Sequence, residues 1–201
     1  MGDVKYHWGT QHSKEYPNGK ELTILLLANP SHLEAVDPVV LGRVRAEQHY
    51  MNDQARKKVA PILFHGDAAF AGQGIVYESM QMNGLFNYTT GGTIHIVVNN
   101  QIGFTTAPHN SRSGIYCTDL GKACGSPIIH VNGDSIDDII KACNLAAEYR
   151  QKFGNDVIID IIGFRRNGHN ELDQPRFTQP LMYKQIDQHK PVCQIYEEQL
   201  L

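Results

Sequence analysis

Short apolar runs of strand length alternate with helical patterns along the 201 residues of this chain. The apolar runs cover residues 22–28, 59–64, 93–98, 128–131 and 157–162. A continuous apolar run is typical of a strand buried on both faces, as in a parallel sheet. Strands that alternate with helices build such sheets through right-handed crossovers. The sequence therefore predicts one α/β domain, a doubly wound parallel sheet.

Two of these runs end in polar residues that bear on function. Residues 59–64 lead into Gly66-Asp67, and residues 93–98 lead into Asn99-Asn100. In an open α/β sheet, the loops at the carboxyl ends of the strands lie side by side and bind ligands. We therefore expect Asp67 and Asn100 to face one crevice. The alternative is that Asp67 only caps a turn and that the asparagines only end a strand.

The residue types at this edge favour a metal ion beside an anion. Carboxylate and amide oxygens suit Mg²⁺ or Ca²⁺ rather than zinc. Gly66, Gly72 and Gly74 allow the backbone to approach an anion and to begin a helix whose amides favour phosphate. A divalent cation held by Asp67 and Asn100 beside a diphosphate fits this pattern, with the backbone carbonyl of Ile102 as a natural third ligand.

Several histidines are candidates for a site role. His32 follows the first apolar run, where an imidazole can donate to an anionic substrate or move protons; it can equally be a surface or capping residue. His65 either contacts a cofactor or ends its strand. The pattern alone favours a packed, structural role for His7 and His95.

Two polar segments are expected to be loops near the site. Residues 105–117 have no periodicity and predict a loop over the site. Residues 165–171 follow the last apolar run and carry two arginines and His169, which can hold phosphate or carboxylate groups. A solvated loop held by Arg–Glu pairs is the alternative. Residues 2–19 are predicted to lack regular structure, and residues 180–201 to form helices interrupted at Pro191.

Composition limits which kinds of partner and cysteine chemistry are expected. The net charge of −3 argues against bulk electrostatic binding to nucleic acid or to an anionic membrane. No apolar run approaches the length of a transmembrane helix. The four cysteines have no CxxC spacing and are expected to be reduced thiols, with a zinc site as the weaker alternative.

Longer phrases of the sequence resemble one family. Gly66-Asp67 followed by Asn99-Asn100 is similar to the thiamine-diphosphate motif, usually Gly-Asp-Gly and later Asn-Asn, although Ala68 replaces the third glycine. The whole chain resembles the thiamine-dependent first component of the 2-oxoglutarate dehydrogenase complex. The phrases that carry this resemblance are residues 2–7, 28–34, 65–74, 98–106, 165–172 and 177–185.

The resemblance implies a cofactor and roles for particular residues. It implies thiamine diphosphate and Mg²⁺, with Asp67, Asn100 and the carbonyl of Ile102 as metal ligands. Gly66, Ala68 and Asn100 would lie along the diphosphate, and His169 would lie near it.

The resemblance also implies a substrate, a partner and a location. His7 and His32 would face the 2-oxo acid, which reverses the structural interpretation of His7. The implied reaction is decarboxylation of 2-oxoglutarate with transfer of the succinyl group to a lipoyl group on the succinyltransferase, in the tricarboxylic acid cycle. The enzyme would be a homodimer in the mitochondrial matrix, or in the cytoplasm of a bacterium.

The extent of the chain leads to a separate expectation. Members of this family are several times longer and use a second domain to hold the aminopyrimidine ring. We expect residues 1–201 to form a single, partial diphosphate and magnesium domain that lacks the aminopyrimidine-binding domain. Such an internal fragment should be inactive and poorly soluble alone.

Other functions are weighed against this one. A 2-oxoadipate dehydrogenase or a simple 2-oxoglutarate decarboxylase is the alternative within the enzyme class. A non-catalytic cofactor-binding module is the alternative outside it. A plain NAD-binding domain is disfavoured, because no Gly-x-Gly-x-x-Gly follows the first apolar run.

Overall fold

Four parallel strands form the centre of the fold. The computed structural model describes residues 5–201, so residues 2–4 of the first family-like phrase lie outside the described part. The strands β3 (Ile62–Gly66), β4 (Ile94–Asn99), β6 (Val157–Ile162) and β5 (Ile128–Asn132) lie in that order across the sheet. All three pairings are parallel, which confirms the predicted sheet.

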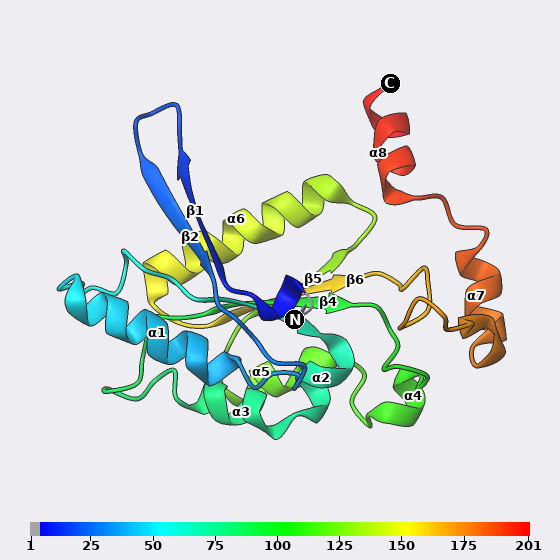
Figure 1. Ribbon diagram of the computed structural model, residues 1–201, viewed down its shortest axis with the longest axis horizontal. Helices are drawn as coiled ribbons and strands as arrows, with labels where there is room; N and C mark the ends of the chain where they lie inside the picture. The colour runs from blue at the N-terminus through cyan, green and yellow to red at the C-terminus, as the bar shows by residue number, and fades with distance from the viewer. Residues whose placement is uncertain (1–4) are drawn as a thin grey trace.

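The sheet is covered by helices on both faces, as expected for a doubly wound fold (Figure 1). On one face α2 (Asp67–Gly72) and α3 (Gly74–Gln81) pack through Phe70, Val76 and Met80 against Val97 and Ile158. On the other face α6 (Ile136–Phe153) covers the strands. The core on this face is formed by Ala142 and Ala146 of α6 together with the strand residues Val131, Val157 and Ile159. Neighbouring residues of β6 thus enter different cores, because side chains alternate along a strand.

The buried stripe of α6 differs from the one that the sequence suggested. The apolar residues at helical spacing in the sequence predict a buried stripe of Ile136, Ile139, Ile140, Cys143, Leu145 and Ala146. Ile139, Cys143 and Ala146 do pack on the sheet, but Ile140 and Leu145 are 53% and 57% exposed. The buried row is Ala142, Ala146 and Arg150, spaced four residues apart. Two alanines allow the helix backbone to approach the sheet closely, so small residues replace the predicted large ones. The helix ends at Gly154 in the left-handed conformation, which is typical of glycine at this position.

The first apolar run does not join the sheet. β1 (Thr10–Glu15) and β2 (Glu21–Leu26) form an antiparallel hairpin, and every residue of both strands is exposed. The expectation of a buried parallel strand at residues 22–28 was therefore wrong, as was that of no regular structure before it. Gly19, with φ 74°, closes the turn between the strands. A tight turn of this kind joins only antiparallel strands, and it outweighs the apolar run.

The remaining helices lie around the sheet. α1 (Asp37–Tyr50) starts at Asp37 with Pro38 in its first turn. The glycine-containing stretch after β3 forms the short helix α2 rather than an open loop. The other elements are η1 (Lys5–His7), α4 (Pro108–Ser111), η2 (Cys117–Asp119), α5 (Leu120–Ala123), η3 (Pro175–Phe177), α7 (Pro180–Ile186) and α8 (Val192–Leu200). Pro191 separates α7 from α8, as predicted. Within residues 5–201, no helix is both long enough and apolar enough to span a bilayer.

Candidate functional site at the carboxyl edge of the sheet

The loops that follow the strands meet at one edge of the sheet. The pairings Gly66↔Val98 and Asn99↔Ile162 bring the strand ends to the same level. The side-chain amide of Gln101 donates to the carbonyl of Gly163 at 2.8 Å, which ties the loop after β4 to the loop after β6. An ideal Cβ on Gly103 would lie 2.8 Å from the Cβ of Ala68, so the loop after β4 also packs directly on α2.

Asp67 lies at the centre of this junction and is 2% exposed. Burial raises the pKa of its carboxyl above the usual range, whereas Arg112 and the backbone amides of Asp67, Ala68 and Asn100 lower it. Because the backbone amide of Asn100 acts on this carboxyl, the start of the loop after β4 lies beside Asp67. A buried carboxylate in this setting favours a cation beside it, because burial penalises an uncompensated charge.

The two asparagines after β4 have different surroundings. Asn99 is 5% exposed, and its amide donates to Asp160 Oδ1 at 3.0 Å beneath the loop. Asn100 is half-buried, and its side-chain oxygen accepts the amide of Ile102 at 3.1 Å. Gln101, which follows Asn100, has φ 61°. Asn99 thus anchors the loop, while Asn100 lies beside Asp67, a distinction that the Asn-Asn pair alone did not reveal.

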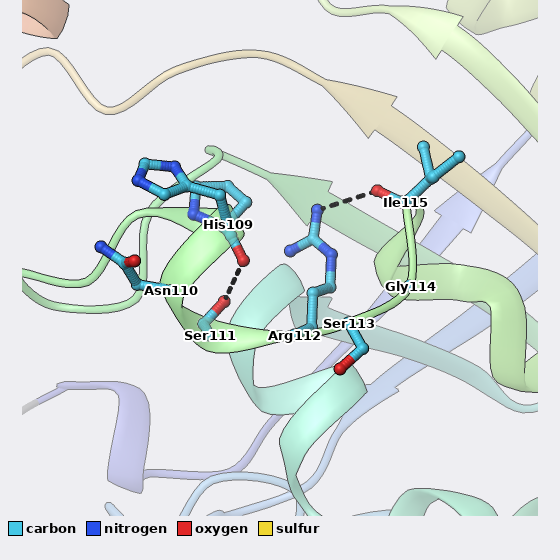
Figure 2. Close-up of a pocket in the computed structure, with 8 residues that line it drawn as sticks. His109, Asn110, Ser111, Arg112, Ser113, Gly114 and Ile115 are labelled. Atoms are coloured by element: carbon cyan, nitrogen blue, oxygen red, sulfur yellow. Dashed lines mark hydrogen bonds between the residues drawn. The ribbon is translucent and has the colours of Figure 1, made fainter.

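Arg112 is the cation closest to Asp67, with 3.6 Å between Nη1 and Oδ2. It belongs to residues 108–115, which line a cavity of about 680 Å³. Figure 2 shows the guanidinium pointing into the space that this segment encloses. Residues 105–117 were expected to lie over the site, and the ion pair between Arg112 and Asp67 agrees with that placement. Its own role was missed, because a single arginine in an aperiodic loop leaves no pattern.

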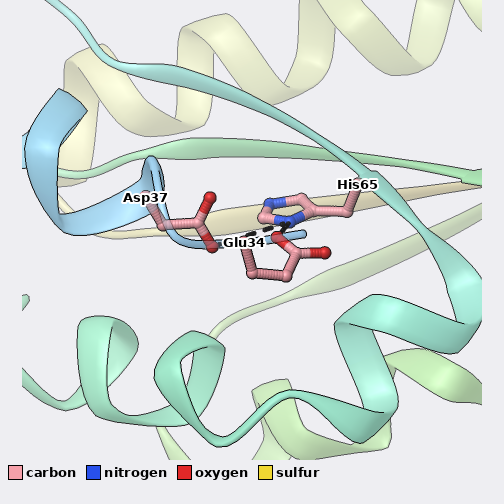
Figure 3. Close-up of side chains that lie close together, drawn as sticks. All are labelled: Glu34, Asp37 and His65. Atoms are coloured by element: carbon pink, nitrogen blue, oxygen red, sulfur yellow. Dashed lines mark hydrogen bonds and ion pairs between the residues drawn. The ribbon is translucent and has the colours of Figure 1, made fainter. Parts of the chain in front are cut away.

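His7 and His32 lie on adjoining segments. The Nε2 atom of His7 is 2.9 Å from the hydroxyl of Ser31, the residue before His32. The same segment continues to Glu34, whose carboxylate is 2.5 Å from Nδ1 of His65 on β3 (Figure 3). Because His65 precedes Asp67 by two residues, this contact anchors the His32 segment to the strand that carries Asp67. Glu34 has φ 69°, a conformation that costs a side-chain-bearing residue about 1–2 kcal/mol.

A buried polar network lies below this anchor. His65 Nε2 is 3.0 Å from His95 Nδ1, and Asp37 Oδ2 lies 3.9 Å from His65 Nδ1. Burial lowers the pKa of His65 to about 3 and raises that of Asp37 to about 7, and it also raises the pKa of Glu34.

The cluster of Glu34, Asp37 and His65 has the residue types of a metal site, and the three are close enough to consider one. The 2.5 Å contact between Glu34 and His65 is nevertheless a hydrogen bond. Two ligands of one zinc ion, each about 2.0–2.1 Å from it, would stand farther apart. We interpret His65 and His95 as structural members of this network.

His169 lies beside the site loops, in contact with Phe104. Its ring meets that of Phe104 edge to face, with 5.2 Å between centroids, and its side chain is exposed. Arg165 donates to the carbonyls of Phe104 and Asn167, both at 3.0 Å. This loop is therefore held by arginine–carbonyl bonds rather than by the Arg–Glu pairs considered above.

The cysteines are free thiols, as predicted. Cys117 is 2% exposed, and burial raises its pKa to about 12.

Comparison with known proteins agrees with the fold. The family described as "Dehydrogenase E1 component" matches residues 1–201. A protein named "2-oxoglutarate dehydrogenase, mitochondrial" from Dictyostelium discoideum is 54% identical over 200 residues, which is 100% of this chain and 20% of that protein. One of the same name from Schizosaccharomyces pombe is 56% identical over 201 residues, with the same coverage. A "2-oxoglutarate dehydrogenase-like, mitochondrial" protein from Xenopus laevis is 54% identical over 201 residues, again 100% of this chain and 20% of that protein.

The chain spans about a fifth of the length of these curated relatives. The match covers every strand of the sheet and both segments that meet at Asp67 and Asn100. This chain belongs to the dehydrogenase E1 component family.

Proposed function

We propose that this chain forms the diphosphate and magnesium part of the site of a thiamine-diphosphate-dependent 2-oxoglutarate dehydrogenase. This enzyme decarboxylates 2-oxoglutarate and passes the succinyl group to lipoyl on its succinyltransferase partner, in the tricarboxylic acid cycle. The observation that carries the proposal is the junction of the buried Asp67 carboxylate with Asn100 at the carboxyl edge of the sheet. The names of the relatives support the choice of 2-oxoglutarate over 2-oxoadipate.

The residues at the junction fit a hydrated magnesium ion. The Asp67 carboxylate, the Asn100 side-chain carbonyl and the Ile102 backbone carbonyl would be its protein ligands, and Mg²⁺ takes its other ligands from phosphate and water. Gly66 and Ala68 would lie along the diphosphate with Asn100 and His169. An ideal Cβ on Gly66 meets nothing within 4 Å, so the backbone there is open to a ligand. Bound thiamine diphosphate supplies the electron sink for loss of carbon dioxide.

His7 and His32 would bind the substrate. The contact between His7 and Ser31 supports this role, because it holds the two imidazoles on adjoining segments. An imidazole N–H can donate to a carboxylate or a keto oxygen near neutral pH. We expect His32→Gln to raise the KM for 2-oxoglutarate, measured by release of carbon dioxide, with a smaller effect on its kcat. An unchanged KM would remove His32 from the substrate site.

The direct test is calorimetric titration of thiamine diphosphate into the full-length protein, with and without Mg²⁺. Asp67→Asn keeps the shape of the side chain but removes its charge, and it should abolish magnesium-dependent binding. Asp134→Asn is the matched control, because Asp134 follows β5 at the same edge but pairs with His189 at 2.8 Å. Equal magnesium-dependent affinity in wild type and Asp67→Asn would contradict the proposal.

The assembly of the enzyme is part of the same proposal. We infer that residues 1–201 act as one domain, that the aminopyrimidine ring is held by residues outside them, and that two subunits build each site. The net charge of −3 gives residues 1–201 no bulk electrostatic attraction to nucleic acid or to an anionic membrane, which supports the proposal that neither is a partner. The relatives are named mitochondrial, which supports the mitochondrial matrix as the location. Sedimentation of the full-length protein should give a dimer.

A further inference from the structure

Arg112 carries hydrogen-bond donors that the fold does not use. Its Nε and Nη1 atoms are buried and have no hydrogen-bond partner. Its Nη2 atom reaches only the carbonyl of Ile115, at a long 3.5 Å. Buried arginine donors are normally paired, since unpaired polar groups are costly away from water. By contrast, the buried Arg150 donates to three backbone carbonyls.

The place of these donors indicates what they bind. They lie at the cavity formed by residues 108–115, and the Nη1 atom is 3.6 Å from the Asp67 carboxylate. A guanidinium presents a planar fork of N–H donors that matches the oxygens of a phosphate group. An anion that binds beside Asp67 would therefore meet the free donors of Arg112.

We propose that Arg112 is a ligand for the cofactor's diphosphate, and that it competes with the metal ion for Asp67 until the diphosphate binds. This inference rests on the proposed function, since it takes thiamine diphosphate as the anion.

The competition follows from charge and distance. A magnesium ion bound to Asp67 at about 2.0–2.1 Å would stand next to a guanidinium that faces the same carboxylate. Two cations at one carboxylate repel each other, and the repulsion is strong in a buried site. A negative diphosphate that binds the metal ion and the Arg112 guanidinium would relieve this repulsion. Arg112 should thus oppose binding of the metal alone and favour binding of the metal with diphosphate.

Opposite effects of one substitution test this inference. In the full-length protein, Arg112→Ala should bind Mn²⁺ alone several-fold more tightly than wild type, measured by the electron paramagnetic resonance of free Mn²⁺. It should bind inorganic pyrophosphate or thiamine diphosphate with Mn²⁺ at least tenfold more weakly. Arg112→Lys keeps the charge but loses the fork, so only the second effect should appear. Arg43→Ala is the control, since Arg43 is exposed on α1 and pairs with Glu47.

A second measurement uses the wild-type protein. Trypsin cleaves after Arg112 only if the side chain enters the protease, and Ser113–Tyr116 beyond it are exposed. Magnesium with thiamine diphosphate should slow this cleavage at least tenfold, whereas thiamine without phosphate should not. Cleavage after the exposed Lys122 is the internal control.

The outcomes separate the two proposals. If wild type binds thiamine diphosphate with metal, but Arg112→Ala binds both ligands like wild type and cleavage is not slowed, only the role of Arg112 is wrong. If both affinities of Arg112→Ala fall together, Arg112 supports the loop and does not compete with the metal. If wild type binds no thiamine diphosphate, the proposed function fails and this inference fails with it.

Discussion

Gly103→Ala should weaken the metal site without touching a metal ligand. An ideal Cβ at Gly103 lies 2.8 Å from the Cβ of Ala68, whereas carbon atoms pack best about 3.5–4.0 Å apart. The added methyl group therefore has to move by about 1 Å. Gly103 has no positive φ, so alanine there introduces no backbone strain of its own. The neighbour is a short side chain on α2 that cannot turn aside.

The displacement separates the ligands. Asn100 and Ile102 belong to the loop that must retreat, and Asp67 begins the helix from which it retreats. Overpacking of this size costs about 1–3 kcal/mol. Magnesium requires near-ideal ligand geometry, so most of this cost should fall on cofactor binding. A loss of about 1.4–2.8 kcal/mol corresponds to a Kd for magnesium thiamine diphosphate raised by about 10–100-fold.

A double-mutant cycle isolates the contact. Calorimetry on the full-length protein would compare Gly103→Ala, Ala68→Gly and the double variant. Ala68→Gly removes the clash and should recover most of the lost affinity, giving a coupling energy of at least about 1 kcal/mol. Gly42→Ala on α1, where an added Cβ also meets nothing within 4 Å, should leave the Kd unchanged. Wild-type affinity in Gly103→Ala, or a double variant in which Ala68→Gly does not restore binding, would contradict this packing effect.

Three further predictions concern the buried groups around the site. Burial raises the pKa of Asp37 to about 7. The folded chain therefore takes up a proton at Asp37 as the pH falls through 7, whereas the unfolded chain does so only at lower pH. The free energy of unfolding thus rises as the pH falls through 7 and decreases as the pH rises. Relative to Asp37→Asn, wild type should gain about 1 kcal/mol of protection in β3 between pH 8 and pH 6, measured by amide hydrogen exchange. Asn99→Asp places a carboxylate against the buried Asp160 and should lower the thermal unfolding temperature, while the same change at Asn100 should mainly alter metal affinity in calorimetry. Arg150→Met removes a donor from three backbone carbonyls, although Gln48 still reaches those of Val59 and Thr90, and should cost about 1–3 kcal/mol in chemical denaturation; an unchanged stability would contradict this role.

Sequence patterns were reliable where one segment determines its own structure. The run at residues 157–162 is β6, because a strand buried on both faces needs apolar residues at every position. Gly154 ends α6 because glycine adopts the left-handed conformation without strain. The pattern failed at residues 22–28, where the same apolar character occurs in an exposed hairpin strand. Pairing with β1 determined the outcome there, and pairing is not a property of the run itself.

Some features of the site likewise follow from the sequence, and others follow only from tertiary packing. The sequence alone determined that Asp67 and Asn100 follow parallel strands, so their meeting at the carboxyl edge follows from the topology of the sheet. Only the tertiary structure decided that Asn99 is turned to Asp160 while Asn100 lies at the junction, and that Arg112 reaches Asp67. These facts depend on contacts between segments far apart in the chain. Periodicity and motifs report local conformation and burial, whereas the partner of a buried polar group is set by the packing of the whole fold.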